Sequence, residues 1–194
     1  MSRLIGRAAC AIVVVMAMSL SSAAFADTWN NGSGLAEELD YVNLQYPPTI
    51  TVAAGQATPD IYGRVYEAGY TEANGASGAI TAQIGYGAYG SDPRTTTWQW
   101  FSSTYNVQAG NDDEYMASLT VASFGTYSYT YRYSRNGGAS WTAADLDGAG
   151  SNAGLSFNPS GSNLGTLTVT PEPSAALAAL TMAVAGMIRR RHSA

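Results

Sequence analysis

Few side chains in this sequence could take part in chemistry. The chain has one histidine, His192, and one cysteine, Cys10, and none of its nine basic residues is a lysine. His192 and Cys10 both lie near the ends of the chain. The long region between them therefore offers no Ser–His or Cys–His catalytic pair, no lysine base and no histidine-based metal site.

Carboxylates are the remaining candidates for catalysis. Glycoside hydrolysis needs two carboxyl groups on opposite sides of a cleft, whereas most acidic residues of this chain fall in predicted turns of a small domain. We therefore expect solvated surface acids and no enzymatic activity. A small glycoside hydrolase is the least favoured of the alternatives that we consider.

Two groups of acidic residues could supply the oxygen ligands that Ca²⁺ prefers. One group is Asp112, Asp113 and Glu114, and the other is Asp145 and Asp147. The second group does not form an EF-hand loop, because glycine follows at the fourth loop position and not the sixth. A structural Ca²⁺ is thus the one candidate cofactor, and we expect no other.

Tryptophans are the third kind of candidate, because exposed aromatic rings can stack on the faces of sugars. Trp98 and Trp100 are two residues apart, so they share one face of a predicted strand, and Trp141 lies further along the chain. These three residues are candidate carbohydrate contacts if they are exposed. The favoured alternative is that they pack in the core, with Trp98 and Trp100 on the inner face of the sheet.

The central region has the sequence pattern of an all-β domain. Short runs rich in β-branched and aromatic residues recur, with turn signals such as Asn136-Gly137-Gly138 between them. No internal repeat is evident. The strands are predicted at residues 41–46, 49–53, 61–66, 80–86, 97–105, 115–121, 127–134 and 140–144.

Four tyrosines alternate with polar residues from Tyr127 to Tyr133, so their rings share one face of one strand. The segment Gly125-Thr126-Tyr127-Ser128-Tyr129 resembles the corner that enters strand F of immunoglobulin-like sandwiches. The resemblance implies that the hydroxyl of Tyr127 binds nearby backbone. Tyr129 stands where antibody domains have a cysteine. We therefore expect a single immunoglobulin-like antiparallel β-sandwich.

A second resemblance covers about two thirds of this domain. The segments Gln83-Ile84-Gly85-Tyr86-Gly87, Asn111-Asp112-Asp113-Glu114-Tyr115-Met116 and Asn136-Gly137-Gly138-Ala139-Ser140-Trp141, followed by Asp145-Leu146-Asp147-Gly148, look like an accessory β-sandwich module of bacterial extracellular proteins. Such modules have no single known function, so the resemblance implies a fold and an extracellular setting.

The N-terminal region has the three parts of a secretory signal peptide. Arg3 and Arg7 provide the positive start, residues 8–20 are apolar, and Ala24 and Ala26 flank Phe25 in a small-x-small cleavage site. Cleavage is predicted between Ala26 and Asp27. The mature chain would then contain no cysteine, and its stability must come from a packed core.

The C-terminal region also has three parts in order. Pro171, Glu172 and Pro173 form a short extended motif, residues 175–188 are apolar and uncharged, and Arg189, Arg190 and Arg191 follow. The layout resembles the PEP-CTERM sorting signal of Gram-negative bacteria. The resemblance implies recognition of the motif by exosortase, a membrane protease, and a transmembrane helix whose basic end lies in the cytoplasm.

The predicted mature region is strongly acidic, because it contains four arginines and 14 acidic residues between residues 27 and 172. Its net charge is −10. This charge argues against nucleic acid as a partner.

The predicted organisation is a signal peptide (1–26), a lead-in (27–40), the sandwich (41–147), a flexible Gly/Ser/Asn-rich stalk (148–169) and the sorting signal (170–194).

From these features we expect an exported, non-enzymatic protein of the cell surface or exopolysaccharide matrix, with a structural or adhesive role. Its partners would be the secretory translocon and exosortase during export, the membrane before processing, and exopolysaccharide afterwards. The main alternative is a carbohydrate-binding module.

Overall fold

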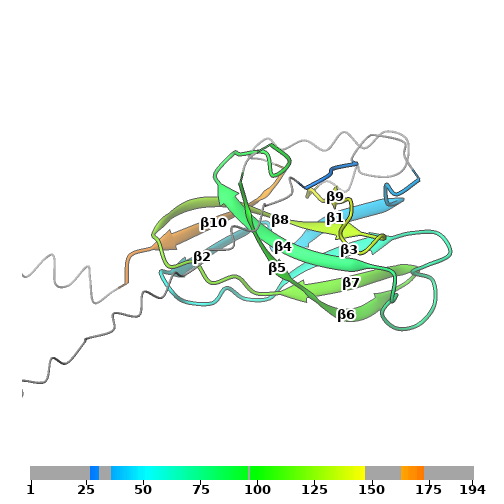
Figure 1. The fold of residues 1–194 in the computed structure, drawn as a ribbon. Coiled ribbons are helices and arrows are strands. Elements are labelled where there is room, and N and C mark those ends of the chain that lie inside the picture. Colours follow the sequence, from blue (N-terminus) through cyan, green and yellow to red (C-terminus); the bar gives the residue numbers. More distant parts are fainter. Residues whose placement is uncertain (1–26, 31–35, 96, 147–162, 173–194) are drawn as a thin grey trace, which may run out of the picture.

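The computed structural model describes residues 27–30, 36–95, 97–146 and 163–172. Within these ranges the chain is all-β, contains no helix, and forms two layers of strands (Figure 1). The strands are β1 (Tyr41–Tyr46), β2 (Thr49–Ala53), β3 (Ile61–Tyr66), β4 (Thr81–Ala88), β5 (Gln99–Ser102), β6 (Thr104–Ala109), β7 (Asp112–Ala117), β8 (Gly125–Ser134), β9 (Thr142–Ala143) and β10 (Gly165–Thr170). The predicted signal helix and transmembrane helix lie outside the described residues.

The strands form two sheets that pack face to face as a sandwich. One sheet has the order β1-β3-β7-β6, and the other has the order β2-β10-β8-β4-β5, with β9 paired to β8. All these pairs are antiparallel except β10 with β2, which is parallel. The prediction of a wholly antiparallel sandwich is therefore wrong at this one pair.

Two of the connections that cross from one sheet to the other are very short. After β1 the chain passes through Pro47, whose preceding peptide bond is cis, and β2 joins the second sheet. The strand predicted at 97–105 is two strands, because β5 pairs with β4 and β6, which begins after Ser103, pairs with β7. Because of these two short connections, β1 and β2 belong to different sheets, and so do β5 and β6.

The row of tyrosines on β8 faces the inside of the sandwich. Tyr129, Tyr131 and Tyr133 are fully buried. The rings of Tyr131 and Tyr133 stack with centroids 5.7 Å apart, and they lie against β3 of the opposite sheet at Gly63, where a Cβ would stand 2.6 Å from the Tyr131 ring. The Tyr131 hydroxyl donates to the carbonyl of Ile61 at 2.5 Å. Gly63, which has no side chain, thus leaves room for the tyrosine rings of the opposite sheet.

The predicted tyrosine corner is also present. The hydroxyl of Tyr127 donates a hydrogen bond to the carbonyl oxygen of Ser123 at 2.9 Å. This bond fixes the loop between β7 and β8 against the first residues of β8. The role predicted for Tyr127 is therefore confirmed.

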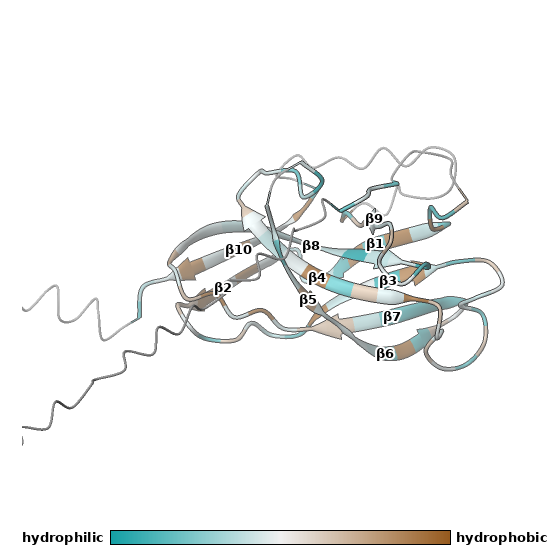
Figure 2. Ribbon diagram, viewed as in Figure 1, coloured by the Kyte–Doolittle hydropathy of each residue, from teal (hydrophilic) through white to brown (hydrophobic). Residues whose placement is uncertain are grey.

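The predicted C-terminal boundary of the domain is wrong. Residues 165–170, which were assigned to the stalk and the start of the sorting signal, form β10, and β10 lies between β2 and β8 (Figure 1). Leu167 and Val169 are buried in the core, at 0% and 2% exposure, while the threonines between them point outward. Alternating colours along the strands of both sheets show the same pattern (Figure 2). The domain therefore extends to Thr170.

The segment predicted as a lead-in is also part of the packed structure. Trp29 pairs with Trp141 through an isolated bridge, and Asn30 is 2% exposed. The Asn30 amide donates to the carbonyl of Glu37 at 2.8 Å, and its oxygen accepts from the Thr142 hydroxyl at 2.8 Å. The first described residues thus form one edge of the domain.

We predict that β10 is required for folding. A chain ending at residue 150 should show no cooperative thermal transition by circular dichroism, whereas a chain ending at Glu172 should melt cooperatively. The physical reason is that burial of Leu167 and of Val169 contributes about 1.5–3 kcal/mol each, against a typical total stability of about 5–15 kcal/mol. Cooperative melting of the shorter chain would show that β10 is dispensable.

Candidate functional site

An open groove lies at the end of the sandwich where β10 ends, which we call the tail end. The groove has a volume of about 490 Å³. It is lined by Tyr86 on β4, Gln99 and Phe101 on β5, Tyr127 on β8, and residues 120–123 of the β7–β8 loop. Residues of β5 therefore form one wall and the β7–β8 loop forms the other.

Three aromatic rings form the apolar part of this groove. Phe101 stacks on Tyr86 with centroids 6.1 Å apart and planes 7° apart. Tyr127 meets Tyr86 edge to face at 5.6 Å. Phe101 remains 42% exposed, whereas Tyr86 is 9% exposed. The groove thus has an aromatic floor and one ring that is open to solvent.

Polar groups complete the lining of the groove. The Tyr86 hydroxyl donates to the Gln99 side-chain oxygen at 3.0 Å. Burial raises the pKa of Tyr86, and the nearby Tyr127 raises it further, so the hydroxyl keeps its proton at neutral pH. Thr120 and Ser123 add hydroxyl groups to the opposite wall. The lining contains no carboxylate, so this arrangement suits binding and does not supply an acid–base pair.

Sequence reasoning did not single out Gln99, Phe101 or Tyr86. Phe101 lies next to Trp100 in the sequence, but successive residues of a strand face opposite sides, so the two rings belong to different surfaces. The alternation of side chains along β5 could have indicated that Phe101 faces the other side of the sheet from Trp100. Attention to the tryptophans alone pointed to the wrong face of this strand.

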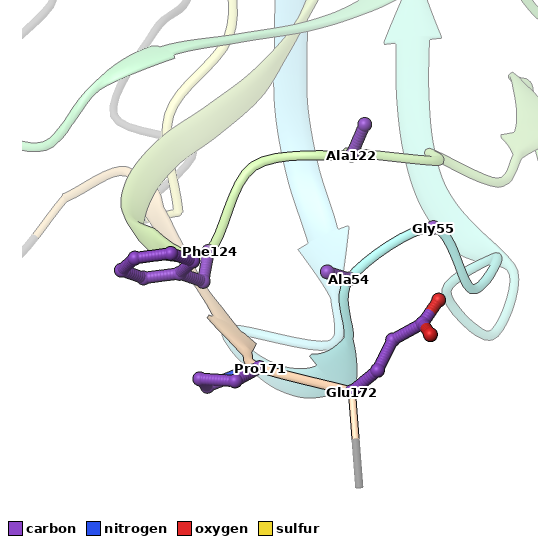
Figure 3. Close-up of a pocket in the computed structure, with 6 residues that line it drawn as sticks. All are labelled: Ala54, Gly55, Ala122, Phe124, Pro171 and Glu172. Carbon is purple, nitrogen blue, oxygen red and sulfur yellow. The ribbon is translucent and has the colours of Figure 1, made fainter. Parts of the chain in front are cut away.

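A second pocket adjoins the groove at the tail end (Figure 3). It has a volume of about 360 Å³. Figure 3 shows Phe124 and Pro171 on one side and the Glu172 carboxylate directed toward Gly55. Ala122 lines both this pocket and the groove. Two residues of the predicted sorting motif, Pro171 and Glu172, are thus part of the surface of the sandwich.

The other residues predicted for export and sorting lie outside the described residues. They are Ala24, Ala26, Pro173, Arg189, Arg190 and Arg191. In the part of the chain that the structure describes, no helix is long and apolar enough to cross a membrane.

The tryptophans lie on the outer face of the second sheet and not on its inner face. Trp100 covers Gly85, and Trp98 covers Gly87; a Cβ on either glycine would stand 2.4 Å from the ring above it. Trp98 and Trp141 are only 7% and 4% exposed. Trp98 packs with Ala143 and Leu164 on this face. The favoured expectation that these rings are packed holds for Trp98 and Trp141, but the inner face expected for Trp98 and Trp100 is wrong. Their burial argues against the alternative that Trp98 and Trp141 contact a sugar, and Trp100 is half-buried.

Arg132 is enclosed by this tryptophan cluster. Its guanidinium carbon lies 4.0 Å from the ring centroid of Trp141 and 4.2 Å from that of Trp100, distances that favour cation–π contact. Asp27 forms an ion pair with Arg132, and Gln83 accepts from its Nε at 2.9 Å. Burial lowers the pKa of Arg132, and the ion pair with Asp27 opposes that shift. The cluster therefore forms a second, outer core.

The structure does not bring the predicted calcium ligands together. Asp113 points away from Asp112 and Glu114, because the three are consecutive on β7. Glu114 pairs with Arg64 at 3.5 Å and accepts from Asn106 at 2.6 Å. Asp145 is buried, and Asp147 lies outside the described residues. Among the residues that the structure describes, no group of three or more His, Cys, Asp or Glu could hold a metal ion.

Comparisons with known proteins relate part of this chain to amylopullulanases. The chain is 31% identical over 109 aligned positions to amylopullulanase of Thermoanaerobacterium saccharolyticum, and this match covers 48% of this chain but 8% of that protein. Similar matches reach 28% identity with the amylopullulanase of Thermoanaerobacter thermohydrosulfuricus over 43% of this chain, and 29% with that of Thermoanaerobacterium thermosulfurigenes over 46%; they cover 7% and 6% of those proteins. No protein-family model matches. The similarity is thus confined to a small part of each relative.

We predict that Asp113 makes stability depend on pH. Asp113 is fully buried, and one carboxylate oxygen accepts from the backbone of Ser77 at 3.0 Å. Burial raises its pKa, Asp112 raises it further, and the Ser77 hydrogen bond lowers it. An acid whose pKa is higher in the folded state favours folding below its unfolded pKa, and this contribution is lost as pH rises through the folded pKa.

The test compares urea unfolding of Asp113→Asn and the original protein between pH 4 and 7. The asparagine variant should gain relative stability as pH rises, while Asp60→Asn, at an exposed position, should change nothing. A difference between Asp113→Asn and the original protein that does not vary with pH would contradict this assignment.

Proposed function

We propose that this protein is an exported, non-enzymatic carbohydrate-binding module of the cell surface or exopolysaccharide matrix, built on an immunoglobulin-like sandwich. The observation that carries the proposal is the groove of Tyr86, Gln99, Phe101 and Tyr127. An exposed ring offers a flat apolar face to the C–H face of a sugar. The amide and hydroxyl groups around it match the hydroxyls at the sugar's edge.

The matched relatives indicate which polysaccharides to test first. The name amylopullulanase refers to amylose-like polysaccharides and pullulan, and these are uncharged polymers. An uncharged ligand also suits a mature region with a net charge of −10, because a polyanion would be repelled. We therefore propose a neutral glucan as the ligand class.

Two observations favour binding over hydrolysis. The groove lining contains no carboxylate, whereas a glycosidase needs two. The similarity to amylopullulanases covers only 6–8% of their length, which suits an accessory region better than a whole catalytic domain. We propose that the protein acts by attachment and leaves its ligand unchanged.

The sequences at the two ends support the proposal of export and sorting. A signal peptide at residues 1–26 would direct the chain to the secretory translocon. The Pro171-Glu172-Pro173 motif, the apolar run and the three arginines would then hold the precursor in the inner membrane until exosortase processes it. The mature module would be released to the cell surface or matrix of a Gram-negative bacterium.

The groove is tested by glucan binding of the chain spanning residues 27–172. Phe101→Ala should weaken binding to amylose or pullulan about tenfold, the effect of losing a ring contact of about 1.4 kcal/mol. Affinity electrophoresis or calorimetry measures the change. The matched control is Tyr70→Ala, whose ring is 43% exposed on the β3–β4 connection at the opposite end, and it should bind normally. Equal binding by both variants would place the ligand elsewhere, and absence of binding by the original chain would reject a glucan ligand.

Sorting is tested separately in the natural host. Replacing Pro171, Glu172 and Pro173 with alanine should leave uncleaved precursor in the inner-membrane fraction on immunoblots. A control with Thr168→Ala, an outward-facing residue of β10, should be processed normally. Normal release of the triple variant would reject the proposed signal.

A further inference from the structure

Among the residues that the structure describes, the pocket at the tail end presents apolar surface to solvent. Phe124 is 70% exposed, and Figure 3 shows Phe124 and Pro171 on one side of the pocket, with Ala54 and Ala122 to their right. The Tyr127 hydroxyl donates to the carbonyl of Ser123, so the backbone just before Phe124 is held against β8. An exposed aromatic ring within an apolar patch is a feature of interaction surfaces.

The same surface is joined by a very short connection to the apolar run at 175–188. Thr170 is the last residue of β10, and its carbonyl accepts from the amide of Ala54 at 2.8 Å. Five residues later the apolar run begins at Ala175, and five residues extend at most about 18 Å. Pro171 fixes its own φ and stiffens the first part of this connection.

We propose that this surface, formed by Phe124, Pro171, Ala54 and Ala122, rests on the lipid bilayer while the precursor is anchored, with the Phe124 ring in the headgroup–acyl boundary. The inference rests on the proposed membrane-spanning role of residues 175–188. A span that begins within about 18 Å of Thr170 leaves the tail end as the part of the sandwich nearest the membrane. Phenylalanine on an apolar patch is a residue type that enters this boundary.

The negative charge of the module does not favour contact between the Phe124 surface and an anionic bilayer. The mature region has a net charge of −10, and Glu172 lies within the patch, so anionic lipid headgroups do not attract it. One phenylalanine and a few small apolar groups provide little binding energy alone. The contact therefore depends on the tether, which keeps the patch at a high effective concentration beside the bilayer. A chain without residues 173–194 should not bind vesicles.

The experiment uses the predicted precursor without its signal peptide, residues 27–194, which is called the full chain below. It is reconstituted in vesicles of phosphatidylethanolamine and phosphatidylglycerol. This chain contains no cysteine, so a single cysteine introduced at Phe124 or at Tyr70 carries an environment-sensitive fluorophore. Tyr70 is the matched control, because it is exposed and lies on the β3–β4 connection, far from the tail end (Figure 1). Circular dichroism confirms that both labelled variants melt like the original chain.

The expected result is loss of fluorescence at position 124, and not at position 70, when the vesicles contain a lipid with a quencher near its headgroup. The label at 124 should become water-exposed in the chain ending at Glu172. Flotation of the full chain with the vesicles is measured first. Failure to float would overturn the proposal together with its membrane anchor.

Two other results would overturn this proposal while leaving the anchor and the glucan groove intact. One is a full chain that floats but shows equal, water-like spectra at positions 124 and 70. The other is a shielded label at 124 in the lipid-free chain ending at Glu172, accompanied by a dimer in sedimentation, which would make a second copy the occupant of the patch.

Discussion

The hydrogen bonding of β10 on both of its edges is the constraint on which the rest of this structure depends. β10 pairs with β8 on one side and with β2 on the other, and Leu167 closes the core beneath them. Because the strand ends at Thr170, the chain beyond it begins at a fixed place on the sandwich. The pocket at Pro171 and the neighbouring groove are therefore properties of the folded domain and not of a flexible linker.

The second sheet has two well-packed faces, and this decides where a ligand could bind. Its inner face carries the tyrosine row, and its outer face carries the tryptophans that enclose Arg132. A guanidinium that loses water is stabilised there by ring faces and by the carboxylate of Asp27. Both faces are largely covered, and the exposed aromatic rings lie away from them, at Tyr46, Tyr70, Tyr89, Phe101 and Phe124. Of these, Phe101 and Phe124 line the two hollows at the tail end.

Much of the fold could be predicted from local patterns. The ranges of β1, β2 and β3 follow directly from alternation and turn residues, and the bond made by Tyr127 was expected from the corner sequence. The failures have a common cause, which is that long-range packing is not visible in a local pattern. Residues 165–170 alternate as a strand should, but the Gly/Ser/Asn-rich segment before them favoured a linker.

The candidate site shows the same limit. Trp98 and Trp100 were correctly placed on one face, yet which face depends on Gly85 and Gly87 of the neighbouring strand, which leave room for the rings on the outside. The groove residues come from three strands and a loop, so no spacing in the sequence marks them. The acidic residues of β7 were close in sequence but alternate in direction.

The position of β10 also has a mechanical consequence. A pull on the chain beyond Thr170 acts along the axis of β10, while its ladder bonds to β8 run across that axis. Such a load is shared by both neighbouring strands at once, in shear, and cannot open the bonds one after another from an exposed edge. The sandwich would therefore resist a pull on its C-terminal end along the whole length of β10.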